Sequence, residues 1–146
     1  MKFTHYSKNP LGRFVVPQTL GTGVKPAGVL WLARDDTWKQ QMIDGIGVTT
    51  WNESYRVQTT CSIAMDTIFI IDTPKLRADV TRTFSPDGYG IDWDVLRRET
   101  GVCGVYVKKG HESYAWVDAW DSDCLALWDP SCIRSATNFT TSSIRD

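Results

Sequence analysis

The stretch KPAGVLWLARDDTW, residues 25–38, decides how the rest of the sequence is interpreted. It predicts a turn, a short apolar strand, and a helix that begins at Asp35 or Asp36. A carboxylate there can accept the free N–H groups of the first helical turn. Trp31 lies in the strand and Trp38 in the helix. Two aromatic residues placed on either side of a strand-to-helix passage predict one wall of a ligand pocket.

The composition is that of a globular protein with one domain of ordinary size. The chain has 146 residues, of which 42% are hydrophobic and 23% charged. A chain of this length can bury a core without the help of disulfides or a structural metal. The formal net charge is −1, and the Lys and Arg residues are dispersed, which argues against an extended nucleic-acid surface. We see no signal peptide and no long apolar run, so we expect a cytoplasmic protein without a membrane partner.

The cysteines and motifs exclude several classes of site. The four cysteines, at positions 61, 103, 124 and 132, form no CxxC pair, so we expect reduced thiols and no metal. No GxGxxG motif follows a strand, no phosphate-binding loop occurs, and no serine nucleophile elbow is present. The sequence therefore predicts a binding pocket more firmly than it predicts a reaction.

Outside the central stretch, the pattern predicts further strands and helices. We expect strands at residues 1–7, 54–64, 67–71, 102–107 and 114–128. Residues 54–64 alternate between apolar and polar, which indicates a strand with one solvent-exposed face. Residues 67–71 are apolar on both faces, which predicts a central strand. Helices are expected to begin near Asp36, Thr73 and Asp92. This order favours an α+β domain with a mixed, mostly antiparallel sheet and three short peripheral helices.

The domain is expected to span residues 1–133, followed by a polar C-terminal tail, residues 134–146, that is loosely held. Within the predicted strand 114–128, Asp121 and Asp123 share an otherwise apolar face. Burying a carboxylate without a partner is costly, so we expect a break near Ser122, where the strand opens onto a cleft. The alternative is that these acids lie on a solvated edge.

Other candidate residues also have a functional and a structural interpretation. His5, in the first strand, can orient a ligand because a neutral imidazole offers one donor and one acceptor. The alternative is a histidine that satisfies its hydrogen bonds within the fold. Seven tryptophans are many for this length. Most are expected in the core, and some of them to line a site for a flat ring.

Three short motifs, in order, resemble those of ADP-ribosyltransferases of the poly-ADP-ribose polymerase and diphtheria-toxin group. FTHYS, residues 3–7, is similar to the first-strand motif, in which a His and a Ser or Thr two positions later hold the ribose and carboxamide side of NAD. GVLWLARDDTW, residues 28–38, resembles the second motif, whose two aromatics sandwich the nicotinamide ring. LALWDPSCI, residues 125–133, resembles the closing strand, which follows the catalytic acid.

The resemblance implies an ADP-ribosyltransferase-like fold and a set of roles. His5 and Ser7 would hold the ribose and amide, Trp31 and Trp38 would clamp the nicotinamide, and an acid would stabilise the transition state. The family's catalytic Glu position falls on Cys124, so Asp121 and Asp123 are the nearest acids. The candidate ligand-binding residues are His5, Tyr6, Ser7, Lys25, Trp31, Trp38 and Trp120. The candidate catalytic residues are Asp121 and Asp123, with Asp121 the first choice because it directly follows Trp120.

The chain also resembles small phage and bacterial proteins with KPxGLW, IDW and WD motifs. These lie here at residues 25–31, where Val29 is an extra residue within the motif, and at residues 91–93 and 120–121. Two functions are therefore expected for one pocket. The first is an ADP-ribosyltransferase or NAD glycohydrolase that uses NAD, with a macromolecular acceptor in the transferase case. The alternative is a phage-type protein that sequesters an NAD-derived or cyclic nucleotide immune signal in the host cytoplasm. In a third interpretation the tryptophans only fill the core of an interaction protein.

Overall fold

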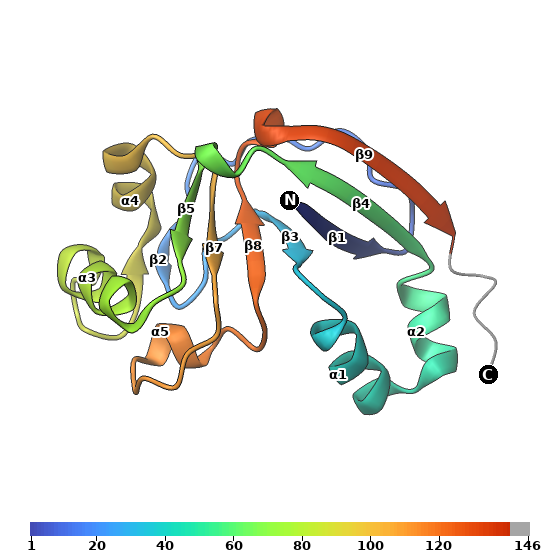
Figure 1. Ribbon diagram of the computed structural model, residues 1–146, viewed down its shortest axis with the longest axis horizontal. Helices are drawn as coiled ribbons and strands as arrows, with labels where there is room; N and C mark the ends of the chain where they lie inside the picture. Colours follow the sequence, from blue (N-terminus) through green and yellow to red (C-terminus); the bar gives the residue numbers. More distant parts are fainter. Residues whose placement is uncertain (141–146) are drawn as a thin grey trace.

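The computed structural model describes residues 1–140, and its frame is a curled seven-stranded sheet with the order β5-β7-β8-β3-β1-β4-β9 (Figure 1). All neighbouring pairs are antiparallel except β5 and β7, which are parallel. A separate two-stranded sheet joins β2 and β6. The strands are β1 Lys2–Ser7, β2 Thr22–Gly23, β3 Leu30–Ala33, β4 Val57–Ile63, β5 Ile68–Ile71, β6 Ile91–Asp92, β7 Gly104–Val107, β8 Cys124–Leu127 and β9 Ile133–Thr140.

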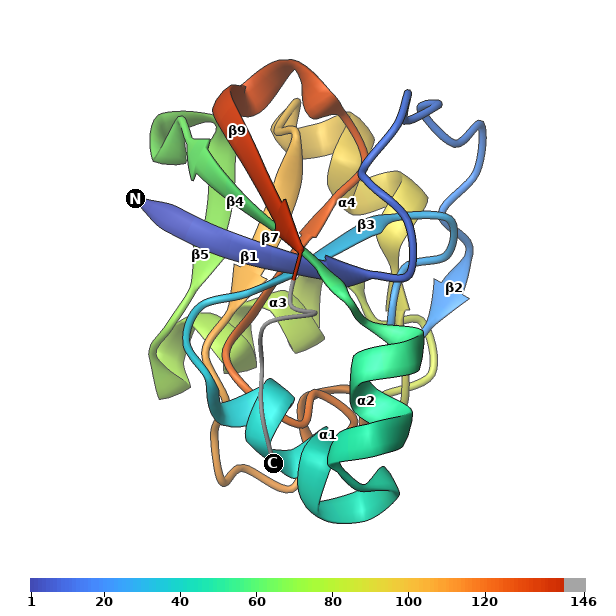
Figure 2. The same ribbon diagram turned by 90° about the vertical axis from the view of Figure 1, so that its right-hand side faces the viewer.

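The helices form two groups on either side of the molecule. Figure 1 places α3 and α4 beside the β5 end of the sheet, and Figures 1 and 2 both place α1 and α2 on one side of β1 and β4. The helices are α1 Thr37–Ile46, α2 Val48–Ser54, α3 Pro74–Phe84, α4 Trp93–Thr100 and α5 Ala115–Asp118, with 3-10 turns at Met65–Thr67 and Pro130–Cys132. The fold is therefore a mostly antiparallel α+β arrangement, as the sequence predicted.

The predicted helix starts are confirmed, because each has a side chain that accepts a free N–H group. The Thr73 hydroxyl caps α3, the Asp92 carboxylate caps α4, and Asp35 accepts from the N–H of Thr37 at 2.9 Å at the start of α1. Gly101 ends α4 with φ of 65°, a left-handed conformation that favours glycine.

The prediction of three helices is wrong, since residues 1–140 contain five α-helices. Gly47, with φ of 86°, ends α1 as its C-terminal cap, and α2 begins at the next residue. The predicted strand 114–128 is also wrong in its first half, where residues 115–118 form α5. There the neighbouring Trp116 and Val117 are both buried, which an alternating strand pattern does not predict. The break expected near Ser122 is present, because β8 begins only at Cys124.

Two further predictions about the sheet need correction. Residues 68–71 form β5 at the edge of the sheet and not at its centre, and Ile70 is 37% exposed. The tail predicted from residue 134 is not loose up to residue 140, because β9 pairs with β4 along its length, for example Ala136 with Cys61. Thr residues are frequent in strands, and this preference competes with the reading of a Ser- and Thr-rich segment as a tail. The remainder of the predicted tail, 141–146, lies outside the described residues.

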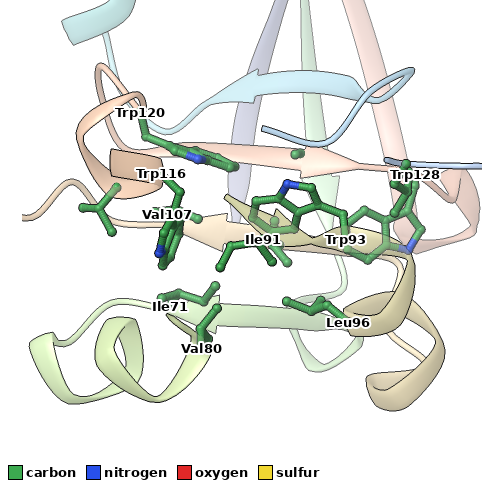
Figure 3. Close-up of a cluster of buried hydrophobic side chains, with 13 residues drawn as sticks. Ile71, Val80, Ile91, Trp93, Leu96, Val107, Trp116, Trp120 and Trp128 are labelled. Carbon is green, nitrogen blue, oxygen red and sulfur yellow. The ribbon is translucent and has the colours of Figure 1, made fainter. Parts of the chain in front are cut away.

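Four buried tryptophans belong to the largest hydrophobic cluster (Figure 3). Each indole N–H donates to an oxygen of another segment: Trp93 to Gly23, Trp116 to Thr81, Trp120 to Val24 and Trp128 to Val102. These hydrogen bonds satisfy four buried indole N–H groups, so the four rings fix the loops around the core as well as filling it. Across residues 1–140, no helix has both the length and the apolar character needed to cross a membrane.

We predict that Gly104→Ala destabilises the protein by about 1–3 kcal/mol. A Cβ at this position in β7 would meet the carbonyl oxygen of Ala126 and lie 2.9 Å from Cδ2 of Leu127 on the paired strand β8. The measurement is the free energy of unfolding in urea. Gly45→Ala is the control, because its Cβ would meet nothing within 4 Å. A helical Ala there should stabilise by about 0.5–1 kcal/mol. Equal effects of the two substitutions would contradict this prediction.

Candidate functional site

A cavity of about 370 Å³ lies where the three strands β1, β3 and β8 meet helix α1, the end of α2 and the segment before β8. All but two of the site residues predicted from the sequence line it; the exceptions are Ser7 and Asp123. The predicted residues that line the cavity are His5, Tyr6, Lys25, Trp31, Trp38, Trp120 and Asp121.

The sheet order explains why segments far apart in sequence share this cavity. Strand β3 pairs with β1 on one side, where Ala33 faces Thr4, and with β8 on the other, where Ala33 faces Cys124. The three strands that carry the three sequence motifs are therefore consecutive in the sheet. Helix α1 follows β3 after a short turn, and its residue Trp38 lines the same cavity as the three strands.

The aromatic lining consists of two groups. Trp31 meets Trp120 edge-to-face, with ring centroids 5.1 Å apart. On the other side, the ring centroid of Trp38 lies 5.7 Å from that of Tyr6 and 5.6 Å from that of Tyr55. Because the described contacts of Trp31 and Trp38 are with different partners, each ring is held by its own neighbours while both border one cavity. Rigid aromatic walls of this kind suit a flat, apolar or cationic ring.

Buried Trp51 packs against all three rings of the second aromatic group, Tyr6, Trp38 and Tyr55. It is fully buried, it stacks on Tyr55 with centroids 4.6 Å apart, and it meets Tyr6 and Trp38 edge-to-face. Sequence reasoning missed Tyr55 as a lining residue because it was assigned to the buried face of a predicted strand. The signal that could have found it is the spacing of Trp51 and Tyr55, four residues apart after Gly47, which is a helical spacing.

His5 has one ring nitrogen fixed by the backbone. Its Nδ1 lies 2.8 Å from the carbonyl oxygen of Trp31, across the β1–β3 pairing. A carbonyl oxygen only accepts, so Nδ1 carries the proton. In the neutral imidazole the other nitrogen, Nε2, is then an acceptor. His5 therefore has a hydrogen bond within the fold and a second polar atom for a hydroxyl or amide donor of a ligand.

Tyr6 presents a phenol that stays protonated at neutral pH. Burial, followed by the negative charges of Asp36 and Asp35, raises the pKa of Tyr6 to about 12. Its hydroxyl can consequently act as a donor at the cavity wall.

The two candidate acids have different environments. Asp121 lines the cavity and is exposed to solvent. The Asp123 carboxylate instead accepts the backbone N–H of Lys109 at 2.8 Å, and Asp123 borders a second cavity together with Arg34. Asp123 thus has a structural partner, and Asp121 is the one of the two acids that lines the cavity.

Ser7 and Cys124 do not offer the groups that the resemblance implies. The Ser7 hydroxyl donates to the carbonyl oxygen of Asn9 at 2.6 Å, and Ser7 is outside the cavity lining. Cys124, at the start of β8, lines the cavity with its sulfur 3.2 Å from the Ser122 hydroxyl. Burial raises the pKa of the Cys124 thiol, so it is neutral at neutral pH and is no substitute for a carboxylate.

Within the described part of the chain, no group of three or more His, Cys, Asp and Glu side chains is arranged to hold a metal ion. No protein-family model, no curated protein and no solved structure matches the chain. What the site can bind must therefore be inferred from its own geometry.

We predict that His5 at pH 8.5 is the tautomer protonated on Nδ1, because the Trp31 carbonyl requires a donor there. Nitrogen-15 NMR shifts of the two ring nitrogens report the tautomer, and exposed His111 serves as the internal reference. A proton found on Nε2 of His5 would contradict the hydrogen bond and the acceptor that we assign to the cavity.

Proposed function

We propose that this cavity binds NAD or an NAD-derived nucleotide, holding the flat ring between its two aromatic groups. The observation that carries the proposal is the convergence of Trp31, Trp38 and Tyr55 with His5 and Asp121 on one cavity. Mostly apolar walls with a few placed polar groups are the usual composition of a small-molecule site.

The polar groups match the substituents of such a ligand. The acceptor nitrogen of His5 suits a ribose hydroxyl or a carboxamide N–H, and the Tyr6 phenol offers a donor. A volume of about 370 Å³ lies at the lower end of the range for ligand pockets. It suits the ring and its ribose, with the rest of a dinucleotide extending toward solvent.

An ADP-ribosyltransferase-like fold is part of this proposal. In support, the strands β1, β3 and β8, which carry the three motifs of that resemblance, are neighbours and border the same cavity. The departure from the family pattern lies at the start of β8, where a neutral thiol replaces the expected acid.

If the protein cleaves its ligand, Asp121 is the residue that would stabilise the transition state. Cleavage of the bond between ribose and nicotinamide develops positive charge on the ribose, and a nearby carboxylate stabilises that charge. Water would then complete an NAD glycohydrolase reaction, and a nucleophile on a macromolecular acceptor would complete ADP-ribosyl transfer. Asp121 is the only acid among the residues described as lining the cavity.

The second candidate is sequestration without turnover, and the neutral Cys124 favours it. A protein of this kind would hold an NAD-derived or cyclic nucleotide signal by stacking and a few hydrogen bonds. It would act in the cytoplasm, that of the host if the chain is phage-encoded. Both candidates use the same cavity, and they differ in whether nicotinamide is released from NAD.

We predict that Trp38→Ala weakens the binding of NAD about tenfold or more, because a stacking aromatic contributes about 1–3 kcal/mol. Calorimetric titration measures the affinity, and circular dichroism verifies the fold. Tyr89→Ala is the matched control, since Tyr89 is 61% exposed and is not among the residues lining the cavity. An unchanged affinity in folded Trp38→Ala would argue against the aromatic site.

We also predict that Asp121→Asn reduces nicotinamide release from NAD about a hundredfold or more if the native protein releases it. Chromatography of the reaction mixture measures the free nicotinamide. Asp123→Asn is the control, and its rate should remain near the native rate because this carboxylate bonds the Lys109 backbone instead. Native protein that binds NAD and releases no nicotinamide would exclude the enzymatic candidate and support sequestration.

A further inference from the structure

The face of the Trp31 ring already has a cation beside it. The Lys25 ammonium lies 5.7 Å from the ring centroid, within the range of a cation–π contact. Lys25 is exposed, on the segment between β2 and β3, and it lines the cavity along with Trp31. A contact of this kind at an exposed site is weak, about 0.5–1 kcal/mol, so a ligand can replace it.

The rest of the cavity also favours positive charge. Asp121 lines it, and, after burial, the negative charges of Asp36 and Asp35 contribute to the raised pKa of Tyr6, another lining residue. Among the described lining residues, Lys25 is the only Lys or Arg. Several aromatic faces with carboxylates nearby form the environment in which proteins recognise quaternary ammonium ligands.

We propose that the cavity selects a cationic flat ring over a neutral ring of the same shape, and that Lys25 occupies the Trp31 face as a competitor which this ring displaces. The inference rests on the proposed function and specifies its ligand. The ring of oxidised NAD is a cationic N-substituted pyridinium, whereas reduced NAD and free nicotinamide carry a neutral ring. Selection for the cation therefore favours oxidised NAD, and in the case of turnover it favours release of the neutral nicotinamide.

Two small probes isolate the charge of the ring from the phosphates of NAD. The 1-methylnicotinamide cation and neutral nicotinamide have nearly the same shape, and neither has a phosphate that could pair with Lys25. We would titrate both by calorimetry at low ionic strength into the native protein, Lys25→Met and Lys75→Met. Lys75→Met is the matched control because it removes the same charge from a position outside the cavity lining. The Lys75 side chain is 87% exposed and pairs with Asp79 on α3.

The native protein should bind 1-methylnicotinamide more tightly than nicotinamide. Lys25→Met should raise the affinity for the cation about two- to fivefold, because the competing contact is lost and the like-charge repulsion with it. The preference for the cation over nicotinamide should increase in this variant, and Lys75→Met should behave as the native protein does.

Equal affinities of the two probes for the native protein would overturn the inference, as would a lower affinity of Lys25→Met for 1-methylnicotinamide. In either case, NAD binding that depends on Trp38 would leave the proposed function standing. If NAD and both probes fail to bind the native protein, the proposed function fails and this inference fails with it.

Discussion

The pairing of β3 with two antiparallel neighbours is the constraint on which the candidate site depends. Its backbone joins β1 on one side and β8 on the other, so the ends of all three strands lie together. The hydrogen bond from His5 to the Trp31 carbonyl crosses one of these pairings and fixes the imidazole. The site also depends on the register of β3 against its two neighbours, because a shift of one residue would turn every side chain of β3 to the opposite face.

The tryptophans divide according to what surrounds them. Trp93, Trp116, Trp120 and Trp128 are buried and donate to oxygens of other segments, so they hold the core together. Trp31 and Trp38 remain half-buried at the cavity, each against its own aromatic neighbours. Trp120 serves both regions, since it packs in the core and also forms part of the cavity wall. This shared ring connects the rigidity of the core to the shape of the site.

The acids show why the site could be predicted only in part. Asp121 and Asp123 are two residues apart on a predicted strand, where Asp121, directly after Trp120, is the first candidate and Asp123 the second. In the structure they precede β8 in an irregular segment, where Asp123 bonds the backbone of Lys109 and Asp121 reaches the cavity. The hydrogen bond that holds Asp123 depends on the path of the loop around residue 109, which is distant in sequence, and no local pattern reports it.

The sequence by itself determined the local elements, because capping side chains, glycines and hydrophobic periodicity act within a few residues. It predicted the helix starts at Thr73 and Asp92 and the placement of Trp31 and Trp38 on a strand and the following helix. Only the tertiary structure decided that β5 lies at the sheet edge, that residues 134–140 add a strand, and that Tyr55 joins the cavity. These outcomes depend on long-range strand pairing and packing, whose free energy is shared between segments that the sequence keeps apart.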